Sequence, residues 1–312
     1  MRLHVAVVIV GFRNAGDIAA CLQALEQSTH ADFEVVVCEN GGRAAFEALR
    51  RSVPERLAGG QPVRLVDAGA NLGYGGGVNR GMAEALDADA YWVLNPDTKP
   101  EPGALAACVA RLAEGDCDAV GCTLYTPDGR VQAYGGQWQW LLGRAVAIGH
   151  GAETSAAVSA ADVERRQSFI SGAAALVSRR FLETVGPMRE DYFLYCEEVE
   201  WFLRGRAKRM RLGFAPDGRI LHDAGSTTGS HRAFRDMPKT PVYLNERNRI
   251  LLTRDLSPAL LPVVVLGALL VTVLRYARRG AWRQLGYAWA GLSAGVCNRR
   301  GPPAWIPIGD GS

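Results

Sequence analysis

The feature that most constrains the fold is a regular alternation of apolar, strand-like runs and helix-like segments in the first third of the chain. Residues 4–10 (HVAVVIV) are continuous and rich in β-branched side chains, as in a strand buried on both faces of a parallel sheet. Residues 14–27 then carry apolar side chains at helical spacing. Further strands are expected at 34–38, 63–66 and 90–94. This order of alternating elements predicts a doubly wound, mostly parallel α/β sheet.

The middle of the chain is less regular. A helix is expected at 103–113 and a strand at 119–124. Residues 125–168 contain scattered Gly, Trp and Ala and are expected to form loops around a site. A strand is expected again at 169–177, followed by a helix over 197–209.

The composition changes after Leu256. Residues 258–274 carry no charge, and four arginines interleaved with aromatic residues follow: Arg275, Arg278, Arg279 and Arg283. A spanning helix needs about 20 apolar residues, whereas this run is shorter and contains Pro262 and Gly267. We therefore predict a helix or hairpin that lies on the membrane, with the arginines facing anionic headgroups. A spanning helix and a buried core helix are the alternatives.

These changes divide the chain into two expected parts. Residues 1–255 form an α/β domain with a ligand-binding half (1–124) and a second half (125–255), and residues 256–312 form the helical, membrane-associated segment. A chain of 312 residues with 48% hydrophobic and 21% charged residues can bury a sizeable core.

The charge and the cysteine content argue against a nucleic-acid partner, a disulfide framework and a zinc site. The net charge of +3 gives no reason to expect nucleic acid. The seven cysteines are odd in number and have no CxxC spacing, which favours neither a disulfide framework nor a zinc site. The N-terminus runs straight into a strand without the pattern of a signal peptide, so we expect a cytoplasmic location.

Polar residues follow each of the first four predicted strands. Open α/β sheets bind ligands beyond the carboxyl ends of their strands. The residues at these positions are Arg13, Asn14, Glu39, Asn40, Asn71 and Asp97. Each alone could be an ordinary turn or helix cap, but together they suit a nucleotide, which needs a carboxylate for base or ribose and donors for phosphate.

The segment Asn71–Asn79 (NLGYGGGVN) joins the third strand to a helix. Its glycines would let the backbone approach a ligand, and a helix N-terminus attracts diphosphate. It has neither the GxGxxG spacing of a dinucleotide site nor the GK[ST] of a P-loop. A tight turn accounts for one of these glycines but poorly for four.

Two positions are candidate metal ligands. The fourth strand ends in Asn95-Pro96-Asp97, and Mg²⁺ or Mn²⁺ often takes one or two carboxylates together with substrate phosphate. The same tripeptide is also good type I turn chemistry. His222 follows a strand-like stretch at 219–221 and precedes Gly225 and Ser226, which makes a metal or phosphate role plausible beside an ordinary structural one.

Three acids, Glu197, Glu198 and Glu200, begin a helix behind the aromatic run that starts at Asp191. Acids in a first turn are favourable for the helix dipole alone. The functional alternative is a general base, because a carboxylate near an aromatic wall can accept a hydroxyl proton. Mutual repulsion would raise the pKa of at least one of them.

These motifs, in this order, resemble the family 2 glycosyltransferases of GT-A fold, and most closely their rhamnosyltransferase-like branch. The resemblance spans residues 4–255. It implies that Glu39 contacts the nucleoside and that Asp97 and His222 hold the metal. It also implies that Glu198 is the catalytic base.

The resemblance assigns the other motif residues to two groups. The donor group comprises Phe12, Arg13, Asn14, Asn71, Gly73, Gly75, Gly76, Asn79, Asn95 and Asp97. The acceptor side, which includes the segment 169–174 (FISGAA), comprises Ser171, Gly172, Glu197, Glu200 and Trp201. Arg247 and Asn248 resemble an Arg-Asn pair that precedes the membrane-proximal helix. The chain departs from the family pattern in having Glu39 for an aspartate, neutral Asn95 in an Asp-x-Asp motif, and Phe12-Arg13 for Tyr-Asn, so Arg13 could pair with phosphate.

The implied activity is an inverting, Mg²⁺- or Mn²⁺-dependent transfer of a sugar from a nucleoside diphosphate to a hydroxyl group. dTDP-rhamnose is the favoured donor, with UDP- or GDP-sugars possible. The acceptor would be a cell-envelope glycan or polyprenyl-linked glycan at the inner face of the cytoplasmic membrane. The alternatives are a sugar-nucleotide nucleotidyltransferase and a catalytically inactive sugar-nucleotide-binding protein.

Overall fold

The computed structural model describes residues 3–223 and 234–309, so Gly225 and Ser226 lie outside the described residues. The main sheet has the strand order β3-β2-β1-β4-β10-β6-β11-β5, with β7 paired to β6. The strands are β1 (Val5–Gly11), β2 (Phe33–Glu39), β3 (Val63–Asp67), β4 (Ala90–Leu94), β5 (Thr98–Pro100), β6 (Ala119–Tyr125), β7 (Val131–Ala133), β10 (Ala174–Ser178) and β11 (Leu212–His222). Strands β3, β2, β1 and β4 are parallel, whereas β10 is antiparallel to both β4 and β6.

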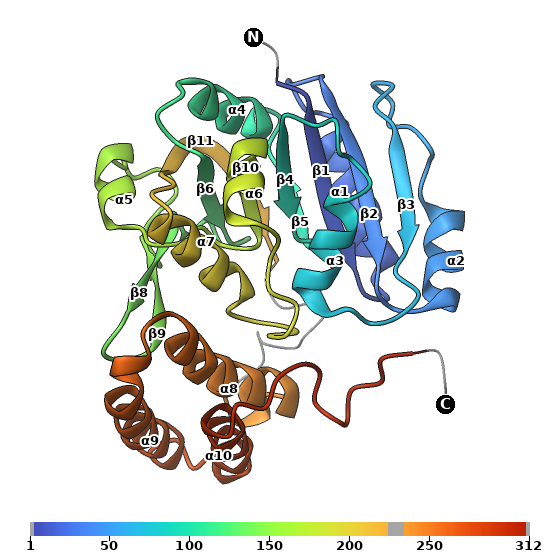
Figure 1. Cartoon of the computed structure of the whole chain (residues 1–312). Coiled ribbons are helices and arrows are strands. Elements are labelled where there is room, and N and C mark those ends of the chain that lie inside the picture. Colours follow the sequence, from blue (N-terminus) through green and yellow to red (C-terminus); the bar gives the residue numbers. More distant parts are fainter. Residues whose placement is uncertain (1–2, 224–233, 310–312) are drawn as a thin grey trace.

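Helices cover both faces of the sheet (Figure 1). They are α1 (Ala15–Leu25), α2 (Arg43–Ser52), α3 (Gly73–Met82), α4 (Ala104–Ala113), α5 (Ala160–Arg166), α6 (Arg179–Val185) and α7 (Glu197–Ala207). Because side chains alternate along a strand, β1 sends Val5, Val7 and Ile9 into the core beneath α1 and α4. Its residues Ala6, Val8 and Val10 enter the core beneath α3, α6 and α7. The mixed, mostly parallel doubly wound sheet confirms the fold class expected from the sequence.

Two local expectations were wrong. Residues 125–168 are not irregular: besides β7 and α5 they form a hairpin of β8 (Gly135–Gln139) and β9 (Arg144–Ile148). Strands this short, with glycines within them, carry too little periodicity to be recognised. The strand expected at 169–177 begins only at Ala174, because Phe169 instead pairs with Gly136 in an isolated bridge.

The C-terminal part is a layer of helices below the sheet in Figure 1: α8 (Lys239–Leu256), α9 (Leu261–Ala277) and α10 (Trp282–Val296). Leu251 and Leu252 of α8 join the core of the α/β part. The stretch Pro258–Ala277 is long and apolar enough to cross a membrane by length and composition, with a mean hydropathy of 2.2, and only 22% of its most apolar window is buried. The expected apolar helix is therefore present. The chain after α10 returns toward the sheet (Figure 1).

Candidate active site

A cavity of about 730 Å³ opens at the carboxyl ends of β1 and β4, between the sheet and the C-terminal helices. Strands β2 and β3 lie on one side of β1, and the chain then returns to place β4 on its other side. Such a reversal leaves a crevice where the two directions diverge. The sequence-predicted residues that line the cavity are Phe12, Arg13, Asn14, Asn40, Asn71, Gly73, Asn95, Asp97, Ser171, Gly172, Glu197, Glu198 and His222.

Glu39 stands behind the cavity wall. Its Oε1 accepts hydrogen bonds from the backbone N–H groups of Arg13 (3.0 Å) and Gly41 (2.7 Å), which ties the ends of β1 and β2 together. Burial raises the pKa of this carboxyl group, although the two N–H donors counteract part of the rise. The Arg13 guanidinium donates to the carbonyl of Gly41 (3.1 Å), and its side chain borders the cavity.

The glycines of the Asn71–Asn79 segment serve packing. A Cβ atom on Gly73, whose φ is +74°, would lie 2.2 Å from the carbonyl oxygen of Phe193. A Cβ atom on Gly77 would lie 2.5 Å from Val10 of β1, and one on Gly76 would meet Leu72. Close contact of α3 with the sheet and the 188–193 loop therefore requires these glycines independently of any ligand.

Several expected site residues lie away from the cavity. The described residues that line the cavity do not include Gly75, Gly76, Asn79, Glu200 or Trp201. Asn79 exchanges hydrogen bonds with the backbone of Met188, at 2.8 and 2.9 Å. Glu200 forms an ion pair with Arg204 (2.8 Å), and the buried Trp201 indole donates to Gly186 O. These side chains hold α3, α7 and the loop before α7 in place.

Asp97 and His222 face each other across the end of the sheet. His222 Nε2 lies 3.3 Å from Asp97 Oδ1, and its Nδ1 lies 2.7 Å from Gln132 Oε1. An amide oxygen at Nδ1 favours the tautomer with its proton there, which leaves the Nε2 lone pair toward the carboxylate. Buried Nε2 has no hydrogen-bond partner among the described residues. A lone pair and a carboxylate oxygen this close suit a shared cation between them.

No group of three or more His, Cys, Asp or Glu side chains in residues 3–223 and 234–309 is arranged to enclose a metal. A metal held here would complete its coordination with substrate oxygens, as Mg²⁺ does when it binds phosphates through one or two carboxylates.

Two acids at the start of α7, Glu197 and Glu198, also line the cavity. Glu198 packs against the 169–174 segment, since a Cβ atom on Gly172 would lie 3.2 Å from Glu198 Cγ. The Tyr74 hydroxyl donates to the carbonyl of Gly172 (2.5 Å), which joins this contact to α3. The motif at 171–172 thus forms the floor on which the Glu198 side chain rests.

Glu197 and Glu198 differ in environment although both line the cavity. Glu197 is fully buried, and its Oε2 has no hydrogen-bond partner within residues 3–223 and 234–309, whereas Glu198 is partly exposed. Burial raises the pKa of Glu198, but backbone N–H groups at the start of α7 moderate the rise. Burial, followed by the charge of Glu198, raises the pKa of Glu197 to about 8. With a pKa of about 8, Glu197 keeps its proton near neutral pH.

The loop before these acids has a strained backbone. Phe193, Tyr195 and Cys196 all have φ near +70°, a left-handed conformation that side chains disfavour. Asn248 of α8 donates through Nδ2 to the carbonyls of Tyr192, Leu194 and Tyr195, at 2.8 to 3.0 Å.

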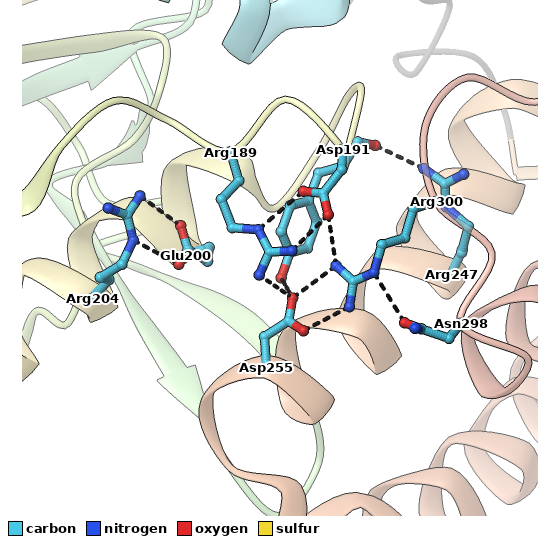
Figure 2. A network of polar contacts seen from close by, with 9 residues as sticks. Arg189, Asp191, Glu200, Arg204, Arg247, Asp255, Asn298 and Arg300 are labelled. Carbon is cyan, nitrogen blue, oxygen red and sulfur yellow. Dashed lines mark hydrogen bonds and ion pairs between the residues drawn. The ribbon is translucent and has the colours of Figure 1, made fainter.

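Arg247 donates to the carbonyls of Tyr192 (2.8 Å) and Gly301 (2.6 Å). Below the loop, Asp191 and Asp255 are each bound by both Arg189 and Arg300 (Figure 2). The Arg247-Asn248 pair and this ion-pair cluster hold the strained loop in shape.

The comparisons with known proteins agree with this geometry. Residues 6–186 match the family described as Glycosyl transferase family 2. The chain belongs to this family and is a glycosyltransferase.

Two curated proteins similar to this glycosyltransferase are called N-acetylglucosaminyl-diphospho-decaprenol L-rhamnosyltransferase, from the Mycobacterium tuberculosis strains CDC 1551/Oshkosh and ATCC 25618/H37Rv. Each is 28% identical over 266 residues, which cover 78% of this chain and 84% of the relative. These two relatives confirm the expected resemblance to a rhamnosyltransferase-like branch of the family.

Solved structures confirm the GT-A fold. Mannosyltransferase PcManGT from Pyrobaculum calidifontis, in complex with GDP-Man and Mn²⁺, has a TM-score of 0.57 at 14% identity, covering 96% of this chain and 88% of its own. GalNAc-T7 with UDP, GalNAc and Mn²⁺ has a TM-score of 0.60 at 14% identity, and the match covers 81% of this chain and 48% of the GalNAc-T7 chain. S. aureus TarS 1–349 in complex with UDP-GlcNAc has a TM-score of 0.54 at 11% identity, covering 99% of both chains.

Some residues of the glycosyltransferase site carry little signal in the sequence. Gln132, which orients His222, lies in a region that was expected to be irregular. Tyr74 is hidden within the glycine run, and Trp305 follows the last helix in a proline-rich segment. The one signal in the sequence for Trp305 is its position between prolines, in the stretch PPAWIP at 302–307.

Proposed function

We propose that the enzyme transfers a sugar from a nucleoside diphosphate donor to a hydroxyl group by a single inverting displacement. The observation that carries this proposal is the convergence of Asp97, His222 and Glu198 on one cavity at the sheet edge. The first two lie where a donor diphosphate would approach the strand ends, and Glu198 lines the same cavity from the start of α7.

In the proposed reaction, Glu198 accepts the proton of the acceptor hydroxyl. The oxygen then forms a bond to the anomeric carbon while the bond from that carbon to the diphosphate breaks on the opposite face. Protonated Glu197 keeps negative charge away from the neighbouring carboxylate. The resulting product has inverted configuration, and the nucleoside diphosphate leaves.

Asp97 and His222 are the residues that would hold a divalent cation, and the buried Nε2 of His222, which has no hydrogen-bond partner in the described part of the chain, supports this role. Such a cation, when bound, neutralises negative charge that develops on the leaving diphosphate. The Mn²⁺ in the complexes of PcManGT and GalNAc-T7 is consistent with the assignment.

For the substrates, we propose dTDP-rhamnose as donor and an N-acetylglucosaminyl diphospholipid as acceptor. The rhamnosyl group and the acceptor rest on the name of the mycobacterial relatives, which match over most of both chains, whereas dTDP is the nucleotide that the family resemblance favours. Incubation of the protein and Mn²⁺ with dTDP-, UDP- and GDP-sugars and this acceptor tests it. We expect release of a nucleoside diphosphate together with a glycosylated acceptor. Release of pyrophosphate would instead indicate a nucleotidyltransferase, and binding without turnover an inactive protein.

We also propose that α9 and α10 lie on the cytoplasmic membrane. Both helices are at the end of the molecule remote from the sheet (Figure 1). Their exposed apolar side chains are Val263, Leu266, Leu270, Val271, Val273, Leu274, Trp282, Trp289 and Val296. Arginines at 275, 278, 279 and 283 border them, which suits an anionic lipid surface. Co-sedimentation with vesicles should be stronger for anionic than for zwitterionic lipid and should weaken with salt.

A further inference from the structure

The chain that follows α10 forms part of the cavity wall. We call residues 301–308 (GPPAWIPI) the strap. It runs from the end of the helical layer to the carboxyl edge of the sheet (Figure 1). Trp305, Ile306 and Pro307 line the cavity together with residues of both halves of the α/β part.

The strap is anchored at both ends. Arg300, just before it, contacts Asp191 (2.9 Å) and Asp255 (2.6 Å), as Figure 2 shows. The Gly301 N–H donates to the carbonyl of Asp191 (2.7 Å). At the far end, the carbonyl of Ile308 accepts from the N–H of Asn71 (2.6 Å). Prolines at 302, 303 and 307 fix φ and lower the entropy lost on ordering, so the strap forms a defined wall.

Trp305 presents an aromatic surface within this wall. Its ring contacts Tyr243 edge to face at 4.8 Å, and Lys239 Nζ lies 3.5 Å from its centroid. Its Nε1 lies 3.4 Å from Thr240 Oγ1, yet the residue remains 40% exposed. Positioned aromatic rings that line a cavity offer large apolar area at low entropic cost to the C–H face of a sugar.

The position of Trp305 points to the acceptor. Its neighbour Ile306 packs against the same buried cluster as Leu194 and Tyr195, which lie on the loop that leads to Glu198; this cluster includes Phe193 of that loop. Trp305 itself borders the start of α8, which connects to the helices proposed to face the membrane. Arg13 and Asn40, at the ends of β1 and β2, belong instead to the strand-end side.

We propose that Trp305 binds the acceptor sugar and determines acceptor affinity, and that Arg300 is a positioning residue that places it. This inference rests on the proposed function. The probe is N-acetylglucosaminyl diphosphate carrying a short prenyl chain, assayed with dTDP-rhamnose and Mn²⁺.

Trp305→Ala should raise the KM for the probe roughly tenfold, because the aromatic contact is lost, while kcat and the KM for the donor stay unchanged. Trp305→Phe should retain most of the affinity. Leu86→Ala is the control, since it removes an exposed apolar side chain that follows α3, outside the helices proposed to face the membrane, and does not line the cavity. An unchanged probe KM, or an equal rise in donor KM, overturns the assignment.

A double-mutant cycle tests Arg300. If Arg300 acts by placing Trp305, Arg300→Ala should raise the probe KM in the wild-type background and have little further effect in Trp305→Ala. If Arg300→Ala raises the probe KM by the same factor in the wild type and in Trp305→Ala, Arg300 does not act through Trp305, and its assignment as a positioning residue is overturned.

Calorimetric binding of the probe separates this inference from the proposed function. Absence of rhamnosyl transfer by the wild type would contradict the function. Weaker probe binding by Trp305→Ala than by wild type would still support the acceptor contact. Equal binding by the two proteins, or no binding by the wild type, would overturn it.

Discussion

The two sides of the cavity are built in opposite ways. On the strand-end side, Asn95 and Asp97 follow the fully buried strand β4, and their positions follow from the register of the sheet. On the α7 side, Glu198 follows a loop with three residues at positive φ, held by Arg247 and Asn248 from a distant helix. The first side is a consequence of regular folding, whereas the second depends on polar contacts that hold a strained backbone. Substitutions should therefore separate binding of the donor from placement of the base.

The largest effect is expected for Glu198→Gln, which keeps the shape of the side chain but removes the base. The value of kcat should fall by about 10²- to 10⁴-fold while the donor dissociation constant changes little. Steady-state turnover and calorimetric donor titration give the two quantities. Glu197→Gln is the matched control and should retain turnover within about tenfold, because Glu197 is already protonated near neutral pH. Near-normal turnover of Glu198→Gln would exclude it as the base.

Asp97→Asn removes one negative charge from the strand-end side. We expect roughly a 10²-fold loss of kcat/KM with the donor, because the carboxylate no longer holds the cation on the diphosphate. Donor titrations with Mn²⁺ and with EDTA check the cause. EDTA should weaken donor binding by the wild type but barely affect the variant. Equal wild-type affinity with and without EDTA would contradict the role of Asp97.

Asn248→Asp replaces the donor of three hydrogen bonds by an acceptor that repels the same carbonyls. The loop should lose its shape and kcat should fall about 10- to 100-fold, since misplacement by about 1 Å is that costly. Asn245→Asp is the control on the same helix, because the Asn245 side chain donates to Pro241 O within α8 and not to the loop, as far as the described residues show. Equal losses in the two variants would show that the effect comes from the helix and not from the loop.

Glu197 should make stability depend on pH. Its pKa is raised to about 8 in the folded chain, so its contribution to stability is present below the ordinary value near 4.5 and lost as the pH rises through about 8. Glu197→Gln should therefore stabilise the protein at pH 9 by about 4 to 5 kcal/mol relative to its effect at pH 4, since a shift of one pKa unit corresponds to about 1.4 kcal/mol. Urea unfolding at both pH values measures the difference. If Glu197→Gln changes the free energy of unfolding by the same amount at pH 4 and at pH 9, the pKa of Glu197 is not raised.

The contrast between the two sides also explains what the sequence could predict. Buried strands such as 4–10 and 90–94 have continuous apolar runs, so the sheet and the residues after each strand could be placed from local pattern. The antiparallel β10, the β8–β9 hairpin and the contacts of Asn248 could not, because they depend on residues distant in the sequence. The glycines of the Asn71–Asn79 segment suggested a ligand; Gly73 does line the cavity, and packing against Phe193 and Val10 also explains Gly73 and Gly77.

The most direct test measures donor affinity and turnover of Asp97→Asn and Asn248→Asp side by side, in the presence of Mn²⁺. If the strand ends bind the donor and the held loop places the base, Asp97→Asn should weaken donor binding, whereas Asn248→Asp should lower kcat and leave donor binding near that of the wild type. Equal loss of donor affinity in the two variants would contradict this division of the site.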